Sequence, residues 1–324
     1  GGFVALMASE KRGKTFWLLD LAMRGAKQGC KIAFFQAGDM TEDQQLKRIC
    51  VYLAKESDQE RYIGEQWEPV KDCILNQLDT CDLQERECGF GVFTGMNESE
   101  LRNEITREQL IEAAKENKKY KPCYNCQDFA KSRWGTPWLV PINIKNVLTA
   151  KRAKLVINDF FLQNKRKFKL STHANGTLTL KQIKAIVSNW EKTEEFIPDV
   201  IIVDYADLLS GESKDFRHLQ NEIWKGLRSL SQDRHCLVIT ATQADARAYE
   251  QDRLKLTNFS EDKRKYAHVT AMYGLNQDKS DREKKIGIMR INELVVREGD
   301  FSSSNEVRIL QNLRRGRPFL GSYW

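Results

Sequence analysis

An eight-residue segment near the start of the chain has the residue types that bind nucleotide phosphates. Residues 8–15 read Ala-Ser-Glu-Lys-Arg-Gly-Lys-Thr, the spacing of a Walker A loop with Ala8 in place of the first glycine. Backbone N–H groups of such a loop surround phosphate oxygens, the Lys14 ammonium reaches the β- and γ-phosphates, and the Thr15 hydroxyl binds Mg²⁺. The alternative is a chance Gly-Lys-Thr in a polar loop. We predict an ATP and Mg²⁺ site formed by Ala8, Ser9, Glu10, Lys11, Arg12, Gly13, Lys14, Thr15 and Phe16.

An aspartate follows the most apolar run of the chain, residues 200–203. A carboxylate at the carboxyl end of a buried strand is the Walker B arrangement, in which it holds the Mg²⁺ ion. Carboxyl ends of parallel strands meet at one edge of a sheet. We therefore expect Asp204 and Thr15 to share one Mg²⁺ ion.

Two further polar residues follow strands that are expected at the same edge. Asp39 comes directly after the strand 31–35, where a carboxylate can accept a proton from the attacking water. Capping of a helix that begins near Thr41 explains Asp39 equally well. Gln243 follows the strand 236–240, where an amide can hydrogen-bond the γ-phosphate and transmit its loss to the next loop.

Basic residues in the loops after these strands are candidates for contact with a nucleic-acid backbone. Such contacts need only a positive, donor-rich surface, although a solvated loop without a ligand has the same composition. The candidates are Lys214, Arg217, Arg247, Arg253 and Lys255.

Strands and helices alternate along the parts of the chain that carry these residues. The strand 3–8, the helix that contains Phe16, Leu19 and Met23, and the strand 31–35 form one βαβ unit. Further elements are expected, in chain order, as a helix from 150, a strand at 168–172, a helix at 180–190, strands at 200–204 and 236–240 around a helix at 219–230, and β signals at 287–296 and 306–310. This alternation predicts an α/β fold with a mostly parallel central sheet and helices on both faces.

The segment 61–148 breaks this pattern with scattered cysteines, tryptophans and prolines. We predict a core whose first part spans 1–60 and carries the Walker A loop and the catalytic acid. A cysteine-rich, zinc-ribbon-like insertion then spans 61–148. The second part of the core, 149–324, carries the Walker B strand, the glutamine and the basic loops.

Four cysteines of the insertion are candidate ligands of a structural Zn²⁺ ion. A gap of two residues lets two thiolates bind one ion, as in Cys-Tyr-Asn-Cys, and Cys88 competes with Cys81 for one position. Because the segment contains few apolar residues, it is expected to lack a core of its own and to draw folding energy from metal. Buried free thiols are the alternative. The predicted ligands are Cys73, Cys81, Cys123 and Cys126. Aromatic pairs expected to pack around the metal, with base stacking as the alternative, are Trp134 with Trp138 and Tyr120 with Tyr124.

Composition bounds these interpretations. A chain of 324 residues with 41% apolar and 30% charged residues has material for a large core, and no apolar run is long enough to span a bilayer. The net charge of +7 suits contact with a polyanion. Eight cysteines without a signal peptide favour a reducing, cytoplasmic location. The chain does not begin with Met, so we expect further residues upstream.

Together the motifs resemble the RecA-like core of DnaB-type replicative helicases, in particular those encoded by phages and prophages. The resemblance covers most of the chain outside the insertion, and phage relatives carry a similar cysteine-bearing insertion. The matching segments are 8–15, 35–41, 201–209, 240–247, 273–277, 287–292 and 297–299.

The resemblance implies an ATP- and Mg²⁺-dependent motor that moves along single-stranded DNA as a ring, expected to be a hexamer with nucleotide at its subunit interfaces. It implies that Asp39 takes the place of the catalytic glutamate and that Arg297 is an arginine finger given to a neighbouring subunit. Two features depart from the family: an aspartate is shorter than a glutamate, and a Lys-x-Arg pair is reduced to Arg297 behind Val295 and Val296. Two alternatives stay open: an ATP-dependent switch that assembles on a replication, phage or defence partner, and a zinc-bearing DNA-binding module with a degenerate Walker A loop.

Overall fold

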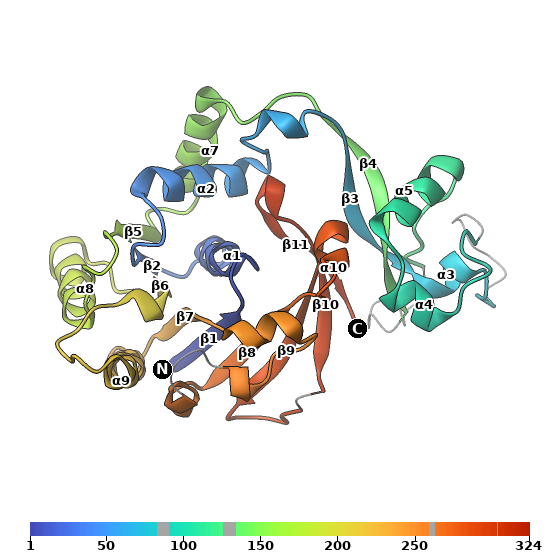
Figure 1. Ribbon diagram of the computed structural model, residues 1–324. Coiled ribbons are helices and arrows are strands. Elements are labelled where there is room, and N and C mark those ends of the chain that lie inside the picture. The colour runs from blue at the N-terminus through green and yellow to red at the C-terminus, as the bar shows by residue number, and fades with distance from the viewer. Residues whose placement is uncertain (83–90, 126–133, 259–262, 303) are drawn as a thin grey trace. The chain divides into compact units, whose positions relative to one another are not determined.

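The computed structural model describes residues 1–82, 91–125, 134–258, 263–302 and 304–324 (Figure 1). These residues form two compact units, each built from segments that are distant in sequence. The first unit contains Gly1–Glu56, Leu148–Asn276 and Asn292–Asn305, and the second contains Ser57–Val147, Gln277–Ile291 and Glu306–Trp324. In the described part of the chain, no helix has both the length and the apolar character needed to cross a bilayer.

A mostly parallel sheet forms the centre of the first unit. Its strands lie in the order β9-β8-β1-β7-β6-β2-β5, and every neighbouring pair from β8 to β5 is parallel. The strands are β1 (Gly2–Ala8), β2 (Ile32–Gln36), β5 (Phe168–Thr172), β6 (Val200–Asp204), β7 (Leu237–Gln243), β8 (Ala271–Asn276) and β9 (Ile288–Val296). Because the strands are parallel, their carboxyl ends share one edge, and the loops at that edge carry most of the predicted site residues.

Helices lie on both faces of this sheet, with α1 and α9 on opposite sides in Figure 1. The α-helices of the unit are α1 (Lys14–Lys27), α2 (Glu42–Ala54), α7 (Ala150–Gln163), α8 (Leu180–Glu194) and α9 (Phe216–Asp233). Short 3₁₀ turns after β6 and β7 are η2 (Ala206–Leu208), η3 (Ala246–Glu250), η4 (Leu256–Asn258) and η5 (Lys263–Ala267). The helix α2 begins with a capping box, in which Thr41 and Gln44 satisfy each other's backbone N–H groups.

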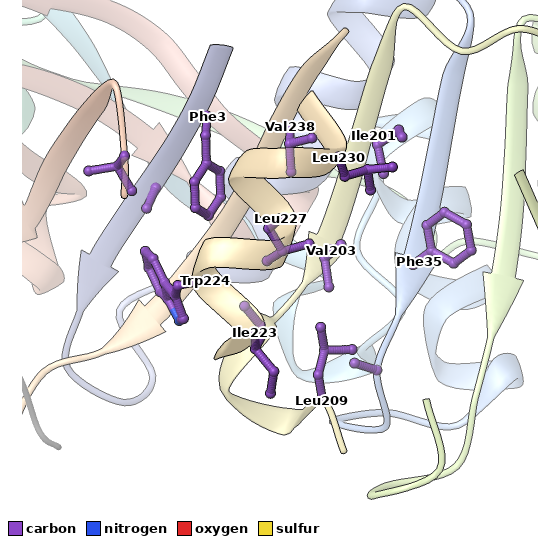
Figure 2. Close-up of a cluster of buried hydrophobic side chains, with 14 of the residues drawn as sticks. Phe3, Phe35, Ile201, Val203, Leu209, Ile223, Trp224, Leu227, Leu230 and Val238 are labelled. Atoms are coloured by element: carbon purple, nitrogen blue, oxygen red, sulfur yellow. The ribbon is translucent and has the colours of Figure 1, made fainter. Parts of the chain in front are cut away.

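The apolar stripe of α9 forms the core on one face of the sheet. Figure 2 shows Ile223, Trp224, Leu227 and Leu230 projecting from α9 toward alternate residues of the strands, which include Phe3, Val203 and Val238. The fully buried Trp224 ring lies 5.4 Å from the Phe3 ring. Full burial of such a side chain contributes about 1.5–3 kcal/mol. This packing fixes α9 against the strands whose ends carry the site.

The second unit combines an antiparallel ribbon, short helices and a pair of strands. The ribbon pairs β3 (Gly64–Cys73) with β4 (Gly135–Ile144) over ten residues. The strands β10 (Glu306–Asn312) and β11 (Arg317–Tyr323) are also antiparallel. The remaining elements are η1 (Glu60–Tyr62), α3 (Ile74–Leu78), α4 (Glu98–Asn103), α5 (Arg107–Glu116), α10 (Arg282–Ile286) and η6 (Leu313–Arg315).

The expectation that the cysteine-bearing segment lacks a core is wrong. Buried side chains from this segment, such as Leu101, Leu110 and Trp138, pack in one cluster with Leu310 and Tyr323 from the end of the chain. The apolar residues that complete the core are thus supplied by distant C-terminal segments. A metal ion is not required to explain the folding of this unit.

Candidate functional site

The segment between β1 and α1 wraps around the ammonium group of Lys14. The helix begins directly after Gly13, whose φ of +85° places it in the left-handed region that favours glycine. The Lys14 Nζ donates hydrogen bonds to the carbonyls of Ala8 at 3.0 Å and Ser9 at 3.2 Å. Burial lowers the pKa of Lys14, and the nearby carboxylates of Asp207, Asp39 and Asp204 oppose that shift. A half-buried cation therefore lies next to the carbonyls of the loop.

Thr15 and Asp204 meet at the edge of the sheet. The Thr15 hydroxyl donates to Asp204 Oδ1 at 3.2 Å, although the two residues lie 189 positions apart in the sequence. Asp204 is fully buried, and desolvation raises the pKa of its carboxyl to about 7, an effect that the Thr15 hydrogen bond opposes.

The second oxygen of Asp204, Oδ2, is buried and has no hydrogen-bond partner among the described residues. A buried carboxylate oxygen without a donor is costly unless a cation or water compensates it. Carboxylate and hydroxyl oxygens are also the hard ligands that Mg²⁺ prefers. Thr15 and Asp204 therefore fit a divalent cation, and the adjacent loop with Lys14 fits phosphate groups.

Asp39 lies in the loop after β2, beside a cavity of about 490 Å³. Gly38 has a φ of +107°, and a Cβ built on it would lie 2.2 Å from the Cα of Asn175. The loops after β2 and β5 thus approach so closely that only glycine fits. The Asp39 carboxylate is exposed; its charge opposes the lowering of the Lys14 pKa by burial and adds to the rise that burial causes in the Asp204 pKa. Asp39 is therefore close enough to Lys14 and Asp204 for its charge to act on both.

His173 lines the same cavity and is absent from the predicted site residues. Its ring is stacked on Phe35, with 6.5 Å between centroids, and its Nε2 lies 2.8 Å from the Ser171 hydroxyl. Burial lowers the pKa of His173, which favours the neutral ring. The position of His173 immediately after the predicted strand 168–172 was the signal that could have identified it.

Asp207 connects three segments next to the loop. Its Oδ2 accepts hydrogen bonds from the Thr242 hydroxyl at 2.7 Å and from the Gln243 backbone N–H at 3.1 Å. Its Oδ1 accepts from Lys265 Nζ at 2.7 Å, and the Lys265 side chain is completely buried. Gln243 lies opposite Ala8 in the β1–β7 register, as its place at the end of a parallel strand requires. Lys265 gave no sequence signal, because it belongs to a polar stretch without apolar periodicity.

A second contact joins the same segment to the loop that carries Lys14. The hydroxyl of Tyr249, in η3, accepts a hydrogen bond from the backbone N–H of Glu10 at 3.1 Å. The residues that follow β7 thus contact both the loop that carries Lys14 and, through Lys265, the turn after β6. A change at one of these positions can be transmitted to the others.

The other predicted residues lie at the surface of the first unit. Arg297 follows β9 and is exposed; its backbone N–H donates to the Thr270 carbonyl at 3.0 Å, and its guanidinium donates to the Ala267 carbonyl. Arg247 is exposed and lies 3.4 Å from Asp245. Exposure is full or partial at all five basic candidates: Lys214, Arg217, Arg247, Arg253 and Lys255.

The predicted zinc ligands are only partly within the described residues. Cys73 and Cys123 are buried and pack in one cluster, Cys81 is partly exposed, and Cys126 lies outside the described residues, as does Cys88. Burial raises the pKa of the Cys73 thiol to about 11, which disfavours the thiolate. No group of three or more potential ligands occurs within the described ranges. A zinc-ribbon-like insertion is therefore not supported there.

Comparison with known proteins identifies the fold. No protein-family model and no curated protein matches the chain. A solved ATPase domain is similar with a TM-score of 0.57 and 14% sequence identity, over 99% of this chain and 85% of that one. A DnaB-like replicative helicase, described together with its interactions with primase, is similar with a TM-score of 0.58 and 13% identity. That match covers 97% of this chain but only 57% of the helicase. The predicted α/β fold and its resemblance to the DnaB-like ATPase core are confirmed at the level of the fold.

Proposed function

We propose that this chain is the ATPase core of a DnaB-like helicase or translocase, which hydrolyses ATP with Mg²⁺ at subunit interfaces and moves along single-stranded DNA. The observation that carries the proposal is the meeting of Thr15 and Asp204 beside the Lys14 ammonium. The fold similarity to an ATPase domain and to a DnaB-like replicative helicase supports the same assignment.

Each residue of the site has a definite task in this proposal. Lys14 and the N–H groups of its loop bind the phosphates, while Thr15 and Asp204 hold the metal ion. Bound Mg²⁺ neutralises charge on the phosphates, and ATP supplies the phosphoryl group that water attacks. Asp39 accepts the proton of that water, and the Gln243 side chain responds to loss of the γ-phosphate.

Residues at the surface serve the assembly and its DNA. Arg297 acts on the nucleotide of a neighbouring copy, which requires head-to-tail packing of subunits in a closed ring, for which we propose six copies. The fully or partly exposed cations at Lys214, Arg217, Arg247, Arg253 and Lys255 contact DNA phosphates. The links of Asp207 and Tyr249 to the segment after β7 give these contacts a physical connection to the phosphate-binding loop.

The experiment compares Lys14→Ala with Lys27→Ala, a change at an exposed lysine in the last turn of the same helix. ATP hydrolysis is measured with and without oligo-dT, and strand separation is followed on a fluorescent forked duplex. We expect stimulation by DNA and unwinding in the wild type and in Lys27→Ala, and neither in Lys14→Ala. Hydrolysis that ignores DNA, or that survives Lys14→Ala, contradicts the proposal.

A second candidate is an ATP-dependent switch that assembles on a partner with little or no unwinding. The short Asp39 side chain favours it, since an aspartate must reach a water that a glutamate usually positions. Tight nucleotide binding and ring assembly without strand separation identify this function. Either candidate function is compatible with a structural Zn²⁺ ion, for which we propose Cys126 as one of the ligands. Metal analysis of the purified protein tests this proposal.

A further inference from the structure

The second unit contains a pocket that the proposed ATPase cycle does not use. It lies between the β3–β4 ribbon and the carboxyl end of α5, with a volume of about 410 Å³. This volume falls within the range of small-ligand sites and suffices for one nucleotide. Its lining includes Trp67, Lys115, Lys118, Tyr120, Trp138 and Pro141, together with one carboxylate, that of the exposed Glu65.

Aromatic side chains give the pocket a rigid apolar floor. Trp138 is 3% exposed and packs on Tyr120, with 4.5 Å between ring centroids. The Tyr120 hydroxyl donates to the buried Asp72 carboxylate at 2.7 Å, which fixes the ring in place. Trp67 and Pro141 face each other in the ribbon register; Trp67 is partly exposed and Pro141 is exposed. A flat ring can therefore stack here without rearrangement of the floor.

Lysines stand at the edge of this floor. Lys115 and Lys118 line the pocket, and both are exposed. Residues 115–121 read Lys-Glu-Asn-Lys-Lys-Tyr-Lys, so four exposed lysines and one glutamate lie within five positions of Tyr120 in the sequence. Cations interleaved with aromatic rings are the pattern that binds single strands, because phosphates follow the lysines and bases stack on the rings.

The carboxyl end of a helix repels anions through its unpaired carbonyl groups. At the end of α5 this repulsion is weakened, because hydrogen bonds occupy some of these carbonyls. The Ala113 carbonyl accepts hydrogen bonds from both the backbone N–H and the side-chain amide of Asn117, at 3.0 and 2.9 Å. The Asn117 carbonyl accepts from the Tyr120 N–H at 2.8 Å. Two carbonyls at this end of the helix, those of Ala113 and Asn117, are thereby already engaged.

We propose that this pocket binds one nucleotide unit of single-stranded DNA, with the base stacked on Trp67 beside Trp138 and the phosphate at Lys115 and Lys118. The proposal deepens the proposed function and rests on it for the identity of the polymer. It gives the second unit a contact with the strand that is separate from the basic loops of the first unit.

The test uses the full chain without nucleotide and oligo-dT that carries 5-iododeoxyuridine. After irradiation, mass spectrometry identifies the crosslinked peptides. We expect a crosslink to a peptide that contains Trp67, Tyr120 or Trp138, and its loss in Lys115→Glu/Lys118→Glu. The matched control is Lys151→Glu/Lys154→Glu, which reverses two exposed lysines on α7 and should leave the crosslink intact.

Fluorescence anisotropy with labelled oligo-dT gives an independent measure. Loss of the one phosphate contact should reduce the slope of log K against log salt by about 0.7, the contribution of one neutralised phosphate of a single strand. Trp67→Leu should weaken binding at the pocket roughly five- to 150-fold, the range expected for one lost stack, whereas Trp67→Phe should retain most of it. Trp67 also packs on the core of this unit, so Trp67→Leu could prevent folding. In that case Lys115→Glu/Lys118→Glu, which changes only exposed side chains, provides the test.

Two outcomes overturn the inference: crosslinks confined to the first unit, or equal competition by polyglutamate, which would indicate a site for acidic peptides. These outcomes leave the proposed function standing if DNA still stimulates hydrolysis. Conversely, a crosslink in the pocket of a protein whose hydrolysis ignores DNA supports the pocket and contradicts the motor.

Discussion

Replacement of the buried Asp204 by asparagine should stabilise the metal-free protein while it abolishes ATP hydrolysis. The pKa of this carboxyl rises from 3.8 to about 7, chiefly because the group is removed from water. A tenfold change in proton affinity corresponds to about 1.4 kcal/mol, so the buried charge costs on the order of 4 kcal/mol above pH 7. Asparagine removes that charge and keeps an acceptor for the Thr15 hydroxyl.

The gain in the free energy of unfolding is smaller than this upper value, because the asparagine amide needs a hydrogen-bond acceptor that the carboxylate did not need. Its NH₂ group would take the place of Oδ2, which has no partner among the described residues, and an unsatisfied buried donor costs about 1–3 kcal/mol. We therefore expect Asp204→Asn to raise the free energy of unfolding by about 1–3 kcal/mol at pH 8.

The pH dependence identifies the cause. A carboxyl whose pKa is raised on folding binds its proton more tightly in the folded state, so the wild type loses stability as pH rises from about 4 to about 7. Below about pH 4 the carboxyl is neutral in both states, and this part of the advantage of Asp204→Asn disappears. The difference between variant and wild type should thus grow through this window and become constant above pH 7.

Urea denaturation in EDTA, from pH 5 to pH 8.5, measures that difference. Asp233→Asn, at an exposed position near the end of α9, controls for a change of charge alone. Addition of Mg²⁺ and ATP should stabilise the wild type but not Asp204→Asn, because the variant lacks a metal ligand. A variant that is less stable than wild type at pH 8 in EDTA, or a difference that does not vary with pH, would refute the reasoning.

Three other perturbations test single contacts. Lys265→Met leaves the Asp207 carboxylate without its buried partner and should lower the free energy of unfolding, measured with urea, by about 3–5 kcal/mol. The double variant Asp207→Asn/Lys265→Met, which also removes the carboxylate charge, should recover most of that loss. Asp39→Asn should lower ATP turnover about 10²–10⁴-fold at nearly unchanged ATP affinity, with Asp43→Asn in the next helix as the control; equal losses in both variants would exclude Asp39 as the base. Gly38→Ala should lower the melting temperature, because the left-handed φ alone costs about 1–3 kcal/mol and the loop after β5 blocks the added methyl; an unchanged melting temperature would show that the loops separate freely.

Much of the first unit could be predicted from local patterns. The strands 168–172 and 200–204 have the same bounds in the sequence analysis and in the structure. The meeting of Thr15 and Asp204 followed from two short motifs and from the rule that parallel strands end at one edge. Such features are encoded by consecutive residues, so they can be predicted without knowledge of contacts between distant parts of the chain.

The second unit could not be predicted in this way. Pro69, Pro137 and Pro141 suggested an irregular segment, yet all three lie within the ten-residue strands β3 and β4. In a ribbon of two strands each strand has one edge that is not paired with another strand. Proline, which has no backbone N–H group, is tolerated where that group would not donate a hydrogen bond to the partner strand. The core of this unit was missed for a related reason, since Leu310 and Tyr323 come from the far end of the chain.

Lys265 matches the charge of one of several carboxylates in the proposed nucleotide site. Asp207, Asp39 and Asp204 all act on Lys14, and Asp207 acts most strongly. The buried ammonium of Lys265 pairs with Asp207 at 2.7 Å, so the charge of Asp207 is matched without Lys14. In the proposed site, Lys14 is thereby left for phosphate and the Asp204 carboxylate is left for the divalent cation. A lysine that no motif includes therefore determines which charges of the site remain for the nucleotide and its metal.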